Sequence, residues 1–265
     1  MIWNDMELKE LSNTGIMVPE VGLGTWKYTG GAEPLRRGIE LGAFLIDTAE
    51  LYRTEDVVGQ AVKGIRDRIF IATKVPGSHL RYDQVMRAAE GSLRQLGTDY
   101  IDLYQIHWPN PSVPIKESMR AMEALADSRQ VKYIGVSNFS VKELEEAQAA
   151  MTKYPLVSNQ VLYNLKRREI EKDLLPYCQQ NHITVIAYTP LADGSLTAPT
   201  QALQEVADEV DKTPAQVALN WCISHSNVIV IPKSNSLARI EENCGASGWR
   251  LSEDQLHRLD EAFPA

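Results

Sequence analysis

The sequence predicts an α/β fold in which eight parallel strands close into one (β/α)₈ (TIM) barrel. Apolar runs of strand length alternate with longer helical patterns along the whole chain. Several of these runs are almost unbroken, which is typical of parallel strands that are covered on both faces. The length of 265 residues also suits one barrel, because such barrels commonly use about 250 residues.

Eight apolar runs are the expected strands. They are Val21–Gly24, Phe44–Asp47, Ile69–Lys74, Ile101–His107, Val131–Ser137, Val157–Gln160, Thr184–Tyr188 and Val228–Ile231. Helical patterns lie between them, and the clearest cover Arg81–Leu96 and Ser140–Met151. The second opens with Ser140 and has Glu143 three residues later, which is the spacing of a capping box. A closed barrel is the economical arrangement of such units, because closure leaves no sheet edge exposed.

A β-hairpin is expected before the first barrel strand. Glu7–Leu11 and Ile16–Val18 flank the turn-forming residues 12–15 (Ser-Asn-Thr-Gly), and this hairpin could cover the bottom of the barrel. No linker rich in Pro, Gly or Ser marks a second domain, so residues 1–265 are expected to form a single domain. The turn-rich segment Asp193–Thr200 is interpreted as a loop over the barrel mouth.

Composition narrows the classes of function. The net charge of −8 argues against sequence-independent nucleic-acid binding, which needs a basic surface. The first residues lack a basic start followed by an apolar core, and no run approaches the roughly 18 apolar residues of a membrane span. Cys178, Cys222 and Cys244 are widely spaced and odd in number, which disfavours a disulfide framework or a zinc site. We expect a cytoplasmic monomer with reduced thiols, no metal, and no membrane or nucleic-acid partner.

Four polar residues fall at or just after consecutive strand ends, where the active sites of such barrels lie. Asp47 ends the second expected strand, Tyr52 follows in its loop, Lys74 ends the third strand and His107 ends the fourth. A phenol, with a pKa of about 10, is a poor acid unless a neighbouring cation favours its ionised form. Lys74 can supply that cation, and Asp47 can hold the lysine by charge pairing. His107 can hydrogen-bond a substrate carbonyl and orient it toward Tyr52.

Each of these four residues also has an ordinary structural interpretation. A strand-end lysine is usually a solvated or capped charge, a tyrosine is usually packing, the histidine could be structural, and the aspartate could cap a turn. All four together on consecutive strand ends favour a catalytic site. In such a site a nicotinamide would supply the hydride, and the protein would position the reactants and manage the proton.

Eight short blocks, read in order, resemble the aldo-keto reductase family. They are Gly22-Leu-Gly-Thr-Trp26, Asp47-Thr-Ala-Glu-Leu-Tyr52, Ile71-Ala-Thr-Lys74, Asp102-Leu-Tyr-Gln-Ile-His-Trp-Pro109, Ile134-Gly-Val-Ser-Asn-Phe139, Asn159-Gln-Val161, Ala187-Tyr-Thr-Pro-Leu191 and Ile231-Pro-Lys-Ser234. The resemblance implies a TIM barrel, NADPH bound without a Rossmann domain, and a catalytic tetrad that by match of motif is Tyr52, Lys74, His107 and Asp47. In agreement, Gly22 and Gly24 do not open a G-x-G-x-x-G fingerprint, because Lys27 stands at the third glycine position.

The resemblance also implies a groove for the cofactor. Ser137, Asn138 and Gln160 match positions that grip the nicotinamide carboxamide, and Tyr188 matches the aromatic residue that stacks on its ring. Thr25 and Asp47 are further matches in this part of the groove. Thr189, Leu191 and Ser195 match positions along the pyrophosphate.

Near the C-terminus, Lys233 and Ser234 precede a helical pattern that carries Arg239, Glu242 and Asn243. The last three share one helix face, because residues three and four apart are neighbours. The resemblance assigns Lys233, Ser234 and Arg239 to the 2′-phosphate of NADPH, and it assigns Glu242 and Asn243 to the adenine. Two cations beside the doubly charged 2′-phosphate favour the binding of NADPH over that of NADH. Without the family match, a solvated Arg239–Glu242 pair is the simpler interpretation.

Departures from the family pattern bear on the substrate. They are Thr189 in place of the usual serine, Arg53 after the tyrosine, and Leu162 and Asn164 in place of a Glu and a His. The chain stops at Ala265 and the loop 109–114 is short, so the long C-terminal loop of larger members is not expected. We therefore expect an open pocket for small aldehydes and dicarbonyls of the methylglyoxal type, with Trp26, Tyr52, His107 and Trp108 as substrate contacts.

Two other interpretations stay open. A barrel lyase or aldolase would use Lys74 as a Schiff-base nucleophile, and borohydride trapping on Lys74 without NADPH-dependent turnover would identify it. A non-catalytic NADP(H)-binding sensor or regulatory subunit would bind NADPH tightly and turn over no carbonyl.

Overall fold

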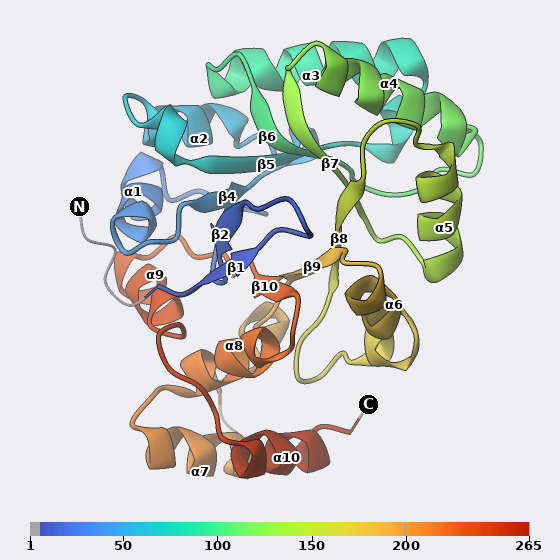
Figure 1. Cartoon of the computed structure of the whole chain (residues 1–265). Coiled ribbons are helices and arrows are strands. Elements are labelled where there is room, and N and C mark those ends of the chain that lie inside the picture. Colours follow the sequence, from blue (N-terminus) through green and yellow to red (C-terminus); the bar gives the residue numbers. More distant parts are fainter. Residues whose placement is uncertain (1–5, 199, 265) are drawn as a thin grey trace.

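The computed structural model describes residues 6–198 and 200–264, and the expected barrel is present in it. Eight parallel strands form one sheet in chain order from β3 to β10 (Figure 1). They are β3 (Leu23–Gly24), β4 (Leu45–Asp47), β5 (Phe70–Val75), β6 (Ile101–Ile106), β7 (Val131–Ser137), β8 (Leu156–Leu162), β9 (Thr184–Tyr188) and β10 (Val228–Val230). Each strand lies on the apolar run that was expected to form it. Expectations for the first five residues, Pro199 and Ala265 lie outside the described residues.

The first and last strands of the sheet meet and close the barrel. Gly22 N donates to Val230 O at 2.8 Å, and Val230 N donates to Glu20 O at 2.9 Å. Gly24 N donates to Pro232 O at 3.0 Å. These bonds pair the two edges of the sheet, which is the closure that the sequence predicted.

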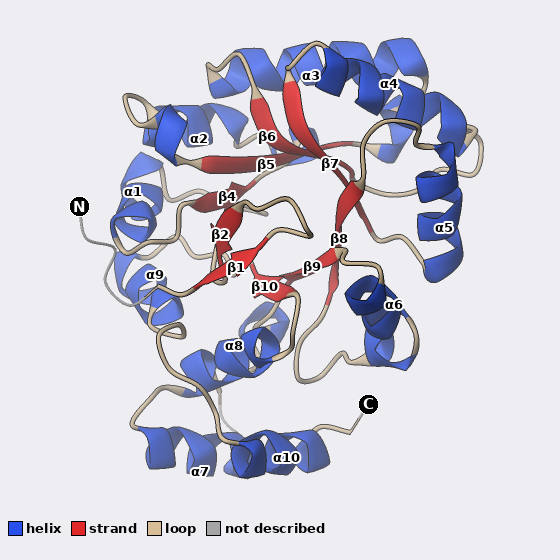
Figure 2. Cartoon of the chain, viewed as in Figure 1, coloured by secondary structure: helices blue, strands red, loops and turns tan. Residues whose placement is uncertain are grey.

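Helices form the outer ring around the barrel (Figure 2). They are α1 (Ala32–Glu40), α2 (Glu55–Val62), α3 (Tyr82–Leu96), α4 (Ile115–Asp127), α5 (Val141–Ala150), α6 (Leu174–Gln180), α7 (Gln201–Val210), α8 (Pro214–Ser224), α9 (Leu237–Cys244) and α10 (Glu253–Ala262). The expected capping box at α5 is confirmed, because Ser140 N donates to Glu143 Oε2 at 2.8 Å and Glu143 N donates to Ser140 Oγ at 3.4 Å. Within residues 6–198 and 200–264, no helix is both long and apolar enough to cross a membrane.

The expected N-terminal hairpin covers the bottom of the barrel. Strand β1 (Leu8–Glu10) pairs antiparallel with β2 (Met17–Pro19), and Figure 1 shows the pair lying across the barrel. Leu11 and Val18 are fully buried with the side chains that fill the barrel interior. Ser12 N donates at 2.8 Å to a hydroxyl at the start of β9, so the hairpin lies at the amino ends of the strands.

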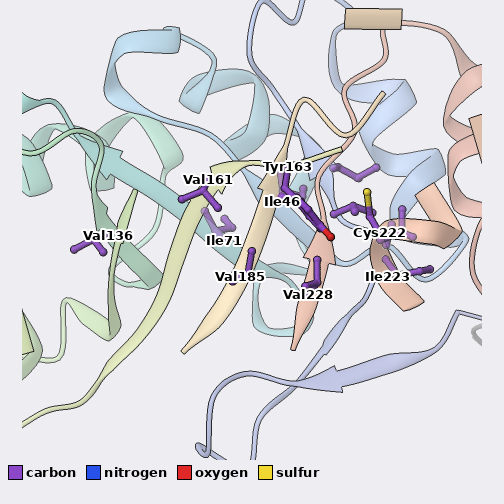
Figure 3. Packing of buried hydrophobic residues seen from close by; sticks show 14 of the residues in the cluster. Ile46, Ile71, Val136, Val161, Tyr163, Val185, Cys222, Ile223 and Val228 are labelled. Carbon is purple, nitrogen blue, oxygen red and sulfur yellow. The ribbon is translucent and has the colours of Figure 1, made fainter. Parts of the chain in front are cut away.

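Alternation along each strand divides the buried apolar side chains into two sets. One set fills the barrel interior and includes Leu45, Phe70, Leu103 and Ile186. The other set lies between the strands and the helices, and Figure 3 labels several of its members, among them Ile46, Ile71, Val136 and Val185. Full burial of one such side chain contributes about 1.5–3 kcal/mol. The two apolar layers stabilise the barrel and leave the strand ends for polar side chains.

The three cysteines are buried free thiols, as the sequence predicted. Burial raises the pKa of Cys178 and of Cys244 to about 12, and it also raises the pKa of Cys222. The thiolate is the reactive form of cysteine, so these thiols are poor nucleophiles at neutral pH.

Gly24→Ala is expected to lower the free energy of unfolding by about 1–3 kcal/mol, the usual cost of forcing extra atoms into packed structure. A Cβ atom at Gly24 would lie 2.5 Å from Ile231 O, a backbone atom of the segment that closes the barrel. Urea unfolding followed by circular dichroism measures the change.

Gly91→Ala is the matched control, because a Cβ atom there would have only Arg94 Nη2 nearby, at 4.0 Å. Inside a helix such as α3, alanine is more favourable than glycine by about 0.5–1 kcal/mol, so this variant should be at least as stable as the wild type. Equal stability of the two variants would contradict the close approach of β3 to the segment after β10.

Candidate active site

The four polar residues expected at strand ends converge at the carboxyl end of the barrel. Asp47 ends β4, Lys74 lies near the end of β5, His107 directly follows β6, and Tyr52 belongs to the 3₁₀ turn η1 (Glu50–Tyr52) after β4. Lys74 Nζ lies 2.6 Å from Asp47 Oδ1 and 3.4 Å from Tyr52 Oη. Tyr52 Oη lies 3.3 Å from His107 Nε2. The phenol hydroxyl therefore stands between an ammonium group and an imidazole.

Lys74 is a buried charge in this group. Its side chain is 0% exposed, and that of Asp47 is 2% exposed. The ammonium group has three hydrogen-bond acceptors, namely Asp47 Oδ1, the carbonyl oxygen of Thr48 at 2.8 Å and Tyr52 Oη. Burial is the largest single effect and disfavours the charged lysine, but Asp47 and Tyr52 together outweigh it, and the pKa of Lys74 is raised. Lys74 is therefore a fixed cation whose three hydrogens all have acceptors.

The phenol of Tyr52 keeps its proton at neutral pH. Burial raises the pKa of Tyr52, whereas the charge of Lys74 lowers it. The cation thus acts in the direction that the sequence suggested, but burial is the larger effect and the net shift is upward. A proton donor must begin in its protonated form, which burial favours here, and the charge of Lys74 would stabilise a phenolate at this position.

His107 is a neutral imidazole. Burial and the nearby charge of Lys74 lower the pKa of His107 from 6.5 to about 3. Within the described part of the chain, its Nδ1 atom is buried without a hydrogen-bond partner. A buried N–H group without a partner is rarer than a buried acceptor without one, so Nδ1 is better left without a proton. The tautomer of His107 with the proton on Nε2 is therefore favoured. His107 and Tyr52 can then donate to one shared oxygen atom.

A cavity of about 530 Å³ opens in front of these groups. Asp47, Tyr52 and His107 line it, together with the expected substrate contacts Trp26 and Trp108. Each tryptophan is 52% exposed, and the Trp26 ring centroid lies 5.0 Å from that of Tyr52. The mouth of the cavity is therefore open and aromatic, as the sequence predicted.

Most of the expected cofactor contacts line the same cavity. They are Thr25, Asp47, Ser137, Asn138, Gln160, Tyr188, Thr189, Leu191, Lys233, Ser234, Arg239, Glu242 and Asn243. Ser195 is exposed and is not among the residues that line the cavity, and Lys166 Nζ donates to its Oγ at 3.0 Å. The expected loop over the mouth is confirmed for its described part, because Asp193, Gly194 and Thr197 line the cavity.

Hydrogen bonds hold the side chains in the middle of the cavity. Asn138 directly follows β7, and its Nδ2 donates to Ser137 Oγ at 3.0 Å. Tyr188 Oη donates to Asn138 Oδ1 at 3.0 Å. Gln160 Nε2 donates to Asp47 Oδ2 at 2.7 Å. The side chains expected to contact a nicotinamide are thus held in place beside the phenol.

The other end of the cavity carries two cations. Lys233 and Ser234 precede α9, and Arg239 with Glu242 lies on that helix. Among the ion pairs that join described residues, none includes Lys233 or Arg239, so the alternative Arg239–Glu242 pair is absent there. Two cations without a carboxylate partner, beside a hydroxyl group, suit a phosphate.

Lys27 and Leu51, which the sequence did not single out as contacts, are among the other side chains that line the cavity. Lys27 follows Trp26 in a left-handed turn at φ 53°, and Leu51 precedes Tyr52 and is 56% exposed. For Leu51 the signal in the sequence was an apolar residue directly before the predicted proton donor. For Lys27 the signal was only its place next to Trp26.

Comparison with known proteins identifies the family. A model of the aldo/keto reductase family matches residues 20–263. Methylglyoxal reductase YeaE of Escherichia coli (strain K12) is 38% identical over 275 residues, which covers 98% of this chain and 96% of that protein.

Two solved structures are similar over nearly their full length. A thermostable aldo-keto reductase, Tm1743, has a TM-score of 0.91 and 39% identity, and the match covers 97% of this chain and 99% of that one. An aldo-keto reductase from Klebsiella pneumoniae, solved with NADPH, has a TM-score of 0.89 and 36% identity, with coverage of 98% and 95%. Fold and site therefore define an enzyme built on a (β/α)₈ barrel. The chain belongs to the aldo/keto reductase family and is an oxidoreductase.

Proposed function

We propose that this chain is an NADPH-dependent reductase that converts small aldehydes and α-dicarbonyls into alcohols, with Tyr52 as the proton donor. The observation that carries the proposal is the position of Tyr52 Oη, 3.4 Å from Lys74 Nζ and 3.3 Å from His107 Nε2, at the wall of an open cavity. We also propose that residues 1–265 act as one domain, which is in line with a family match from residue 20 to residue 263.

Reduction of a carbonyl needs a hydride at carbon and a proton at oxygen. When bound, NADPH supplies the hydride. A carbonyl oxygen that accepts hydrogen bonds from Tyr52 Oη and His107 Nε2 is placed to receive the phenol proton, and the product is an alcohol. Because His107 is neutral, it orients the oxygen, and Tyr52 gives the proton.

Loss of that proton leaves a phenolate on Tyr52, which Lys74 is placed to stabilise. Charges interact more strongly in a buried site than in water, and a fixed cation needs no reorganisation when the new charge appears. Asp47 keeps the lysine charged through an ion pair of 2.6 Å. Lys74 therefore lowers the barrier to proton transfer without giving up a proton of its own.

The cofactor is proposed to lie along the cavity. Lys233, Ser234 and Arg239 would hold the 2′-phosphate of NADPH, since these two cations have no carboxylate partner among the described residues. The other proposed contacts are Glu242 and Asn243 for the adenine, Ser137, Asn138 and Gln160 for the carboxamide, Tyr188 for the nicotinamide ring, and Thr25, Asp47, Thr189 and Leu191 for the rest. The Klebsiella pneumoniae relative, solved with NADPH, supports this cofactor.

Small carbonyl compounds are the proposed substrates. The cavity of about 530 Å³ has to hold part of a dinucleotide as well as the substrate. Trp26 and Trp108 form an aromatic rim that is half exposed, so little of the chain encloses a large substrate. The Escherichia coli relative is named a methylglyoxal reductase, which supports a dicarbonyl substrate.

The geometry favours reduction over the two alternatives. A Schiff-base lyase needs a neutral, accessible amine, but Lys74 is 0% exposed, is paired with a carboxylate and uses all three of its hydrogens. A sensor without catalysis has no need for a phenol held beside both a buried cation and an imidazole.

Tyr52→Phe is expected to lower kcat for methylglyoxal reduction by a factor on the order of 10² or more, because general acid catalysis typically contributes that much. The affinity for NADPH, measured by fluorescence titration, should stay nearly unchanged, because only the phenolic hydroxyl is removed. Tyr177→Phe is the control: it removes a hydroxyl that donates to Gln148 Oε1 at 2.8 Å between two outer helices, and it should keep wild-type turnover.

An unchanged kcat in Tyr52→Phe would remove Tyr52 as the acid. Tight NADPH binding by the wild type, with no turnover of any carbonyl in a panel, would favour the sensor.

Arg239→Ala is expected to raise the Kd for NADPH by about tenfold or more, since a hydrogen bond to a charged group contributes roughly 1.5–3 kcal/mol. The Kd for NADH should change little, because NADH has no 2′-phosphate. Arg94→Ala, at a position 72% exposed on α3, is the control and should bind both dinucleotides like the wild type. An equal loss of affinity for NADPH and NADH in Arg239→Ala would rule out the 2′-phosphate assignment.

A further inference from the structure

The turn that carries Tyr52 must be held in place for the phenol to meet the ammonium group. It runs from Thr48, after β4, to Thr54, before α2, and Arg53 in it is left-handed at φ 55°. Lys74 belongs to β5, which is paired with β4 on one side and β6 on the other, so the phenol–ammonium distance of 3.4 Å depends on where this turn lies.

Three buried hydroxyl groups join the two ends of the turn. Thr48 Oγ1 and Thr54 Oγ1 lie 2.9 Å apart, and Thr54 Oγ1 donates to Thr25 Oγ1 at 3.0 Å. Thr25 Oγ1 donates to the carbonyl oxygen of Asp47 at 2.9 Å. Because a hydroxyl has one hydrogen, Thr48 must be the donor to Thr54. We call Thr48, Thr54 and Thr25 the threonine chain; they are 0%, 5% and 0% exposed.

The threonine chain and the ammonium group of Lys74 share hydrogen-bond partners, namely residues Asp47 and Thr48. The carbonyl oxygen of Thr48 accepts a hydrogen bond from Lys74 Nζ at 2.8 Å. The threonine chain ends at the carbonyl oxygen of Asp47, and the carboxylate of Asp47 pairs with the ammonium group of Lys74. One network therefore connects the turn that carries the phenol with the groups that hold the cation.

Thr54 does not use its hydroxyl for the usual local purpose. It is the N-cap residue of α2, yet its side chain makes no capping hydrogen bond. At the N-caps of α7 and α8, by contrast, Thr200 and Thr213 accept from Leu203 N and Gln216 N. Such a cap contributes about 1 kcal/mol. The hydroxyl of Thr54 serves the threonine chain instead of the helix.

We propose that Thr54 is a positioning residue for the reaction: its buried hydroxyl, by joining Thr48 to Thr25, holds the turn that sets Tyr52 against Lys74. This inference rests on the proposed role of Tyr52 as the proton donor. Thr54 is not among the described residues that line the cavity, so it acts through the groups that it holds. Thr25, which does line the cavity, keeps its own hydrogen bond to the Asp47 carbonyl when the hydroxyl of Thr54 is removed.

Thr54→Val tests the inference, because valine has nearly the same shape and lacks the hydroxyl. We expect kcat to fall by about tenfold or more, since small misplacements of reacting groups are costly. The KM for methylglyoxal and the Kd for NADPH should stay within about twofold, because the cavity wall is unchanged. Thr54→Ser, which restores the hydroxyl, should recover most of kcat.

The pH profile of kcat gives a readout that a merely structural role would not move. Lys74 lowers the pKa of Tyr52, so a turn that drifts away from Lys74 raises that pKa further. Reduction slows as the acid loses its proton, and in Thr54→Val this alkaline decline should therefore occur at higher pH than in the wild type.

Thr184→Val is the matched control. Thr184 is 1% exposed, and its hydroxyl accepts from Ser12 N at 2.8 Å and lies 3.1 Å from Asn227 Oδ1, at the opposite end of the barrel. This variant should lose a similar amount of stability in urea and keep the kcat and pH profile of the wild type.

A Thr54→Val variant that loses only stability, with wild-type kcat and pH profile, would overturn the inference. If Thr54→Val fails to fold, Thr48→Val tests the same threonine chain, because it removes the donor to Thr54 while leaving the carbonyl that binds Lys74.

Wild-type turnover in Tyr52→Phe would instead defeat the proposed function. Loss of turnover in Tyr52→Phe but not in Thr54→Val would defeat only the role of Thr54.

Discussion

The site depends on one buried ion pair, Lys74 with Asp47 at 2.6 Å, inside the mouth of the barrel. An ammonium group taken out of water is costly unless it is paired and hydrogen-bonded, and here a carboxylate, a carbonyl and a phenol satisfy all three of its hydrogens. β4 and β5 are neighbouring parallel strands, so their carboxyl ends and the turn after β4 lie close enough for this arrangement. The fold thus places a fixed positive charge beside the phenol, and Lys74 is not among the residues that line the cavity.

That charge and the surrounding apolar layers set the protonation states of the other groups. Burial keeps Tyr52 protonated and keeps His107 neutral, so the cavity presents two hydrogen-bond donors and no mobile cation to a carbonyl oxygen. The positive charges that line the cavity are instead Lys27, Lys233 and Arg239. In the proposed function, proton donation belongs to Tyr52 and phosphate binding to Lys233 and Arg239, which suits a reductase that takes its hydride from a phosphorylated dinucleotide.

The barrel and the tetrad positions could be predicted from the sequence for physical reasons. Parallel strands buried on both faces are continuous apolar runs, and their carboxyl ends meet at one edge, so Asp47, Lys74 and His107 had to lie together. Features that depend on contacts across the chain could not be predicted. The hydroxyl of Ser195 accepts a hydrogen bond from a lysine 29 residues earlier, and the hydroxyl of Thr54 donates to another hydroxyl 29 residues earlier instead of capping its own helix. The upward shift of the Tyr52 pKa is likewise a consequence of burial in the folded chain.

The central claim is that the ammonium group of Lys74 acts on the phenol of Tyr52. An ultraviolet difference titration against the corresponding Tyr52→Phe protein isolates the ionisation of this one phenol. It is made first in the wild type and then in the double variant Asp47→Asn/Lys74→Met. The double variant removes both charges of the ion pair, so neither is left unpaired. We expect a higher pKa of Tyr52 in the double variant, because the lowering effect of Lys74 is larger than the raising effect of Asp47. The same pKa in both proteins would contradict the central claim.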